Sequence, residues 1–171
     1  MKTLIISSSL SPKSRSYILC KSVFEGLKKK KVDVELFDAR KIELLPHYRE
    51  LTSGMKKLAQ KVMNADNVIF GMGVHNYSVN DSLKIMLDSF SNEACEEKFF
   101  GIVCAAGGQN SYLSTMHLTQ ICMNEWRMIQ LPRIVYATGK DFEGDKLVSE
   151  NVIERVDLFC EDFVKIGKKL M

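Results

Sequence analysis

An α/β protein, with a parallel sheet covered by helices on both faces, is the fold class that this sequence predicts. Five apolar runs of strand length follow one another along the 171 residues, and helical patterns fill the gaps between them. Strands that alternate with helices in this way are typical of a parallel sheet buried on both sides. The length is sufficient for a sizeable core, and we expect a single domain over residues 1–171.

The strands are predicted from runs of apolar, β-branched and aromatic residues. They comprise residues 3–6, 32–37, 67–72, 99–104 and 133–137. The second run alternates between apolar and polar side chains, so we expect it at an edge of the sheet.

The helices are predicted from apolar residues that recur every three or four positions. They comprise residues 17–24 with a basic end at 28–31, then 55–63, 83–90, a less regular segment at 113–128, and about 149–168. The last helix starts with Ser149 and Glu150 and ends with Lys168 and Lys169, which suits the helix dipole.

Five parallel strands in one small domain favour the flavodoxin-like strand order 2-1-3-4-5, in a three-layer sandwich, over the Rossmann order. In either order, ligands bind at the carboxyl ends of the strands, beside the point where the winding reverses. This rule selects the loops after the first, third and fourth strands as the candidate site.

Composition excludes several other classes of protein. The net charge is only +3, which gives no argument for nucleic-acid binding, and no apolar run approaches the length of a membrane span. The five cysteines form no C-x-x-C pair, so neither a metal site nor a disulfide framework is predicted. The N-terminus enters a strand without a signal-peptide pattern, and we expect a reduced, cytoplasmic protein.

A loop rich in hydroxyl groups, residues 7–16, joins the first strand to the first helix. Serine hydroxyls and the unpaired N–H groups of a helix N-terminus favour a bound anion, most often a phosphate. Either Ser14 or Ser16 is expected to cap the helix, while Lys13 and Arg15 add positive charge. A polar loop with an ordinary cap is the alternative; the position after the first strand favours the anion site.

The loop after the third strand, residues 71–81, contains two glycines that allow a ligand to approach the backbone. Its polar side chains are those of His75, Asn76 and Tyr77. Asn80 or Asp81 is expected to cap the next helix. A capped connection with an exposed histidine is the alternative, so no catalytic role is assigned to His75.

The loop after the fourth strand contains the pair Gly107-Gly108, which can present N–H groups to a ligand. A flexible turn is the alternative interpretation. All three loops are expected at one edge of one sheet, where they offer a phosphate end and a flat, hydrogen-bonding end. This combination suits a mononucleotide such as FMN.

The sequence resembles the NADPH-dependent FMN reductase family, in element order over nearly the whole chain and in three partial signatures. The first signature, Gly-Ser-Leu-Arg-x-x-Ser-x-Asn, aligns with residues 8–16. The second, close to Pro-Glu-Tyr-Asn and then Leu-Lys-Asn-x-x-Asp, aligns with residues 73–76 and 83–88. The third is the Gly107-Gly108 loop. Ser11 occupies the position of the family's arginine.

The resemblance implies that FMN is the cofactor, and it implies which residues bind it. The phosphate would be held by Ser9, Ser11, Ser14 and Ser16, with Arg15 or Lys13 replacing the missing arginine. The flavin ring would be lined by Val74, His75, Asn76 and Tyr77 on one side and by Gly107, Gly108 and Gln109 on the other.

The resemblance further implies an enzyme that passes a hydride from NADPH or NADH to FMN and then electrons to a quinone, azo compound, metal ion or free flavin. No general acid or base is assigned. A homodimer or homotetramer is implied, and the segments 42–51 and 139–145 are candidate rim or interface elements. The alternatives are a flavin-binding electron carrier without a nicotinamide reaction, and a family member that binds no flavin.

Overall fold

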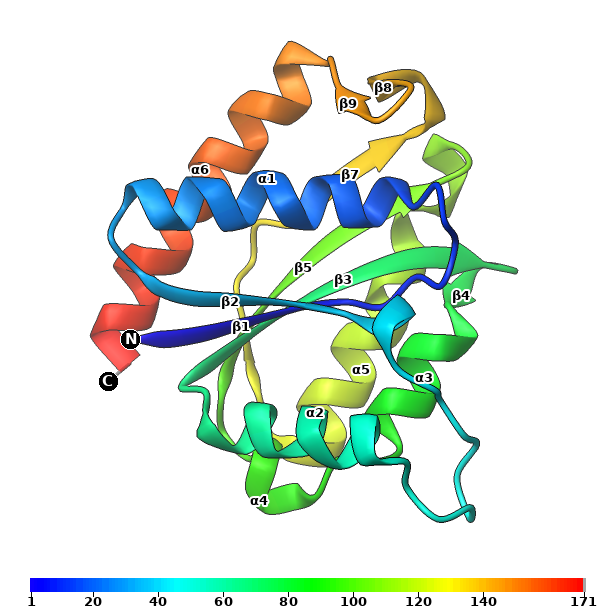
Figure 1. The fold of residues 1–171 in the computed structure, drawn as a ribbon. Helices are drawn as coiled ribbons and strands as arrows, with labels where there is room; N and C mark the ends of the chain where they lie inside the picture. Colours follow the sequence, from blue (N-terminus) through cyan, green and yellow to red (C-terminus); the bar gives the residue numbers. More distant parts are fainter. Residues whose placement is uncertain (171) are drawn as a thin grey trace.

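The computed structural model describes residues 1–170. Its main sheet consists of parallel strands in the order β2-β1-β3-β5-β7 (Figure 1). The strands are β1 (Lys2–Ser7), β2 (Asp33–Asp38), β3 (Asn67–His75), β5 (Phe99–Ala106) and β7 (Val135–Thr138). The predicted flavodoxin-like order is confirmed, with β2 at one edge.

The opposite edge of the sheet is split, where the sequence predicted one strand over residues 133–137. A short strand, β6 (Ile129–Gln130), pairs with the start of β5, and β7 pairs with its end. Between them lies Pro132, which has no N–H to donate to the ladder and is tolerated only at such edges and breaks. Pairing resumes at Val135, two residues later than predicted.

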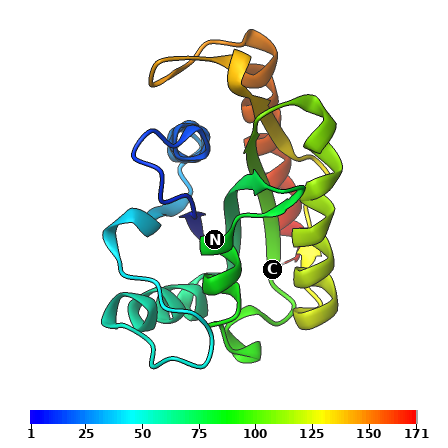
Figure 2. The same cartoon turned by 90° about the vertical axis from the view of Figure 1, so that its right-hand side faces the viewer.

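Helices cover both faces of the sheet (Figures 1 and 2). One face carries α1 (Arg15–Lys29) and α6 (Glu150–Leu170), and the other carries α2 (Ser53–Asn64), α3 (Asp81–Leu87), α4 (Asn92–Cys95) and α5 (Thr115–Trp126). Alternate residues of β1 face opposite sides: Ile5 packs toward α1, and Leu4 and Ile6 pack toward α2. The helix predicted at 113–128 instead begins as the 3₁₀ helix η2 (Gln109–Ser114) before α5.

The packing of α1 on the sheet depends on a glycine in the middle of β3. A Cβ atom at Gly71 would lie 2.0 Å from the Sγ of Cys20 on α1, so no larger residue fits there. Burial raises the pKa of the Cys20 thiol to about 12. All five cysteines are buried and free. Cys20 is therefore a small packing residue that holds α1 against β3.

The segment 139–145, which had no clear pattern in the sequence, is structured. It contains the 3₁₀ turn η3 (Gly139–Asp141) and the start of a hairpin made by β8 (Phe142–Glu143) and β9 (Lys146–Leu147). A second hairpin forms where β4 (Ser78–Val79) folds back on the end of β3. The remaining short element is η1 (Ala39–Lys41), after β2. Within residues 1–170, no helix has both the length and the apolar character needed to cross a membrane.

Candidate functional site

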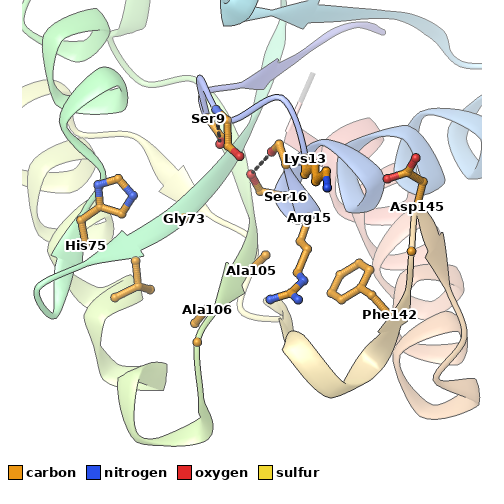
Figure 3. Close-up of a pocket in the computed structure, with 15 residues that line it drawn as sticks. Ser9, Lys13, Arg15, Ser16, Gly73, His75, Ala105, Ala106, Phe142 and Asp145 are labelled. Atoms are coloured by element: carbon orange, nitrogen blue, oxygen red, sulfur yellow. Dashed lines mark hydrogen bonds between the residues drawn. The ribbon is translucent and has the colours of Figure 1, made fainter.

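A cleft of about 580 Å³ opens at the carboxyl ends of β1, β3 and β5 (Figure 3). Four segments line it: the loop after β1, the end of β3, the end of β5, and the β8–β9 hairpin. The lining residues are Ser9, Ser11, Lys13, Ser14, Arg15, Ser16, Gly73, Val74, His75, Ala105, Ala106, Gly107, Phe142, Gly144 and Asp145.

The structure brings eight of the twelve predicted site residues together in this cleft. They are Ser9, Ser11, Ser14, Arg15, Ser16, Val74, His75 and Gly107. The three loops selected from the sequence therefore do meet at one edge of the sheet. Lys13, which was named beside Arg15 as a replacement for the missing arginine, also lines the cleft.

The other four predicted residues lie outside the cleft lining. Asn76 and Tyr77 form the two-residue turn between β3 and β4, with φ angles of 48° and 59°, and the Tyr77 side chain is 62% exposed. Positive φ at both central residues is the pattern of a type I′ hairpin turn. The carbonyl of Gly108 accepts a hydrogen bond from the Tyr136 hydroxyl, and Gln109 is the first residue of η2.

Residues of the β8–β9 hairpin were not among the predicted site residues, because only the loops after the first, third and fourth strands were predicted as the site; the segment 139–145 was named only as a candidate rim or interface element. The loop after the last strand also leaves the carboxyl edge of the sheet, so the same rule selects it. This loop contributes Phe142, Gly144 and Asp145 to the lining. Gly73, Ala105 and Ala106 were missed because they belong to the strand ends themselves.

The serine loop is organised by its own hydroxyl groups. Ser14, rather than Ser16, is the N-cap of α1, since its Oγ accepts the backbone N–H of Tyr17 at 3.0 Å. The Oγ atoms of Ser14 and Ser16 lie 3.0 Å apart, and both residues are buried. Ser9 Oγ accepts the N–H of Ser11 at 3.3 Å. These bonds hold the loop in a defined shape at the positive end of the α1 dipole.

Arg40 braces the serine loop from the end of β2. Its guanidinium forms an ion pair with Asp38 at 2.7 Å, stacks on the ring of Tyr17 at 4.1 Å, and donates to the carbonyl of Pro12 at 3.5 Å. Burial alone would raise the pKa of Asp38, but the hydrogen bonds and charge of Arg40 outweigh it and lower that pKa. Arg40 therefore supports the serine loop, and its guanidinium is already paired with Asp38.

Lys13 and Arg15 are the cations that line the cleft, and both are exposed. Arg15 extends from the start of α1 into the region between Ala106 and Phe142 (Figure 3). Its guanidinium also lies close to Gly139, where a Cβ atom would come within 3.0 Å of Nη1. Positive charge is thus present beside the serine hydroxyls, although Ser11 takes the place of an arginine.

A buried polar network joins the serine loop to the end of β3. Asn80 Oδ1 accepts the N–H of Gly73 at 3.1 Å and lies 3.0 Å from Ser8 Oγ, while Asn80 Nδ2 donates to Ser82 Oγ at 2.7 Å. Ser82 Oγ in turn donates to the Ser8 carbonyl at 2.6 Å. Asn80 is the N-cap of α3 by position, but its side chain makes no capping bond. It ties two walls of the cleft together instead.

The remaining wall is formed by small residues and by backbone. A Cβ atom added at Gly107 or Gly108 would meet nothing within 4 Å, so open space lies beside this loop. The hydroxyl of Tyr136 on β7 donates to the Gly108 carbonyl at 2.5 Å, and this hydrogen bond ties the loop to β7. His75, at the opposite wall, is exposed, and its Nδ1 lies 3.8 Å from Asp81 Oδ1.

The cleft has the features that FMN requires. Serine hydroxyls, Lys13 and a helix N-terminus at one end form a donor set for a phosphate, and Arg15 adds a second cation to the cleft. Gly73, Ala105, Ala106 and Gly107 at the other end leave room for a flat ring against the backbone. The N–H of Gly73 is already bonded to Asn80, so it is not among the donors available to a ligand.

The strand order, and a cleft of this kind where the winding reverses, define a flavodoxin-like nucleotide-binding protein. A profile of the NADPH-dependent FMN reductase family matches residues 1–143. The chain belongs to this family, as its sequence signatures predicted, and it is an oxidoreductase that uses FMN and NADPH.

Individual relatives agree with this assignment. The FMN-dependent NADPH-azoreductase of Staphylococcus aureus (strain USA300) is 26% identical over 177 residues, which cover 96% of this chain and 94% of the relative. The structure of FerB, an NAD(P)H:(acceptor) oxidoreductase from Paracoccus denitrificans, superposes with a TM-score of 0.76 at 17% identity, covering 99% and 98% of the two chains. An archaeal flavodoxin reaches 0.72 at 12% identity, covering 98% and 99%. Both structures share the fold.

Proposed function

We propose that FMN binds in the cleft at the carboxyl ends of β1, β3 and β5, and that the chain transfers reducing equivalents from NADPH or NADH to a small-molecule acceptor. One observation carries this proposal. A helix N-terminus lined by serines and cations and an open wall lined by glycines face the same cleft. The azoreductase from S. aureus supports an azo compound as the acceptor, and a quinone is the second candidate.

The residues of the chain have distinct roles in this proposal. Lys13 and Arg15 neutralise the phosphate, and the hydroxyls of Ser9, Ser11 and Ser16 supply hydrogen bonds to it. The ends of β3 and β5 orient the ring, which supplies hydride and electron transfer when it is bound. His75, exposed at the ring end, packs against the ring edge and has no proton-transfer role.

The proposal is tested by a visible spectrum and by turnover. Purified protein is mixed with FMN, separated from the excess, and then assayed for NADPH oxidation with an azo dye and, separately, with menadione. We expect flavin absorbance together with oxidation that depends on the acceptor. Bound flavin without turnover would support an electron carrier, and a protein that stays colourless in excess FMN would rule out the cofactor site.

The oligomeric state and the compartment are also proposals. We infer a homodimer or homotetramer, supported by exposed apolar side chains on and beside α5, notably Met116, Met123 and Ile129. Light scattering coupled to gel filtration measures this mass. A reducing, cytoplasmic location is supported by the five free cysteines.

A further inference from the structure

The β8–β9 hairpin brings a carboxylate to the cleft. Strands β8 and β9 pair through Phe142 with Leu147 and Glu143 with Lys146, so Gly144 and Asp145 form a two-residue turn. Gly144 has a φ of +55°, as the first position of a type II′ turn requires, and the buried side chain of Phe142 anchors the base of the hairpin. The turn is thereby held so that Asp145 lines the cleft (Figure 3).

Asp145 lies at the end of the cleft that is suited to the phosphate. In Figure 3 it stands on the side of Lys13 and the start of α1, with His75 at the opposite end. Its side chain forms no ion pair with any residue in the described part of the chain, and it is exposed. No described residue therefore neutralises its charge through a direct ion pair, although Lys21, Lys29 and Lys146 line a second cleft that Asp145 also borders.

The formal charges of the side chains that line the cleft have a small sum. Lys13 and Arg15 contribute two positive charges and Asp145 removes one, so these three side chains sum to +1. A phosphate monoester carries about −1.5 to −2 at neutral pH. The Arg15 guanidinium also lies close to the backbone at Gly139.

We propose that Asp145 is a specificity-determining residue that opposes the flavin phosphate, lowers the preference for FMN over riboflavin, and keeps FMN exchangeable during turnover. This inference rests on the proposed function, because it assumes that FMN occupies the cleft. The physical cause is repulsion between two like charges in a solvent-exposed cleft, which salt screens.

The test compares three proteins in fluorescence titrations with FMN and with riboflavin, which has the same ring but no phosphate. They are the natural chain, Asp145→Asn and, as a matched control, Glu143→Gln. Glu143 is an exposed carboxylate on the same hairpin that does not line the cleft. Both substitutions remove one charge at the surface, so the three proteins are expected to fold alike.

We expect Asp145→Asn to tighten FMN binding by about three- to tenfold at low salt, with riboflavin affinity unchanged and no effect from Glu143→Gln. The gain should shrink at 1 M salt. The natural chain should also lose FMN on gel filtration faster than Asp145→Asn does.

Equal FMN affinity in the natural chain and Asp145→Asn would overturn the inference, as would an equal gain for riboflavin or the same gain in Glu143→Gln. In those cases FMN still binds and the proposed function stands. If neither flavin binds the natural chain, the proposed function fails, and this inference fails with it.

Discussion

The side-chain oxygen of Asn80 accepts the backbone N–H of Gly73 at 3.1 Å, from a position almost completely removed from solvent. The same oxygen lies 3.0 Å from the hydroxyl of Ser8. One side chain therefore connects the end of β3 to the loop after β1, and the two main walls of the cleft are held at a set separation by hydrogen bonds.

Replacement of Asn80 by alanine should loosen both walls. The part-buried N–H of Gly73 and the buried hydroxyl of Ser82 would each lose their bond to Asn80, and we expect about 1–3 kcal/mol less stability in urea unfolding. FMN affinity should fall by about tenfold, which corresponds to a binding free energy in the same range as the expected loss of stability. Thr119→Ala is the control, because its hydroxyl bonds only within α5. Full FMN affinity in Asn80→Ala would show that the network does not position the cleft.

Tyr136→Phe removes one hydroxyl and little else. That hydroxyl donates to the Gly108 carbonyl at 2.5 Å, and burial raises the pKa of Tyr136, so the proton stays in place at neutral pH. We expect a loss of about 1 kcal/mol in unfolding free energy and FMN binding weaker by a few fold. Tyr48→Phe, at a side chain that is 96% exposed, should change neither quantity.

Tyr77 adopts a positive φ of 59°, a conformation that costs a residue with a bulky side chain about 1–2 kcal/mol. Tyr77→Gly should therefore raise the free energy of unfolding by about 1 kcal/mol. Asn76→Gly should raise it less, because asparagine tolerates this region better. FMN affinity should stay constant, since Tyr77 does not line the cleft. A drop in stability on Tyr77→Gly would contradict the assignment of strain.

The ion pair between Arg40 and Asp38 should make stability depend on acid pH. The pKa of Asp38 in the folded protein lies below the 3.8 of an unperturbed aspartate, so the pair contributes fully above about pH 4. The contribution is lost as pH falls through the folded pKa. Asp38→Asn should flatten the decline of unfolding free energy below pH 4, as measured by urea titrations, whereas Asp33→Asn, exposed at the start of β2, should not.

Lys13→Gln should distinguish the phosphate end from the ring end of the cleft. We expect FMN binding to weaken by about three- to tenfold at low salt, because one of two cations is lost, while riboflavin binding stays the same. Lys21→Gln, exposed on α1 and outside this cleft, is the control. An equal loss for both flavins would place Lys13 away from the phosphate.

The sequence predicted the strand order because each strand is a separate apolar run, and five such runs with intervening helices leave few ways to wind a sheet. It predicted a continuous last strand because Val135 and its neighbours are as apolar as the other strands. The break became visible only in the pairing, where Pro132 separates β6 from β7.

Local pattern by itself determined the strand order, the main helices and three of the loops that form the cleft, since hydrophobic periodicity and helix-terminus chemistry are properties of neighbouring residues. The tertiary structure alone decided that Asn80 joins β3 to the serine loop, that Arg40 contacts the carbonyl of Pro12, and that Asp145 lines the cleft. Each of these contacts joins residues far apart in the chain. Such pairs meet only after the sheet has brought the carboxyl ends of its strands to one edge, and no periodicity in the sequence encodes the distances between them.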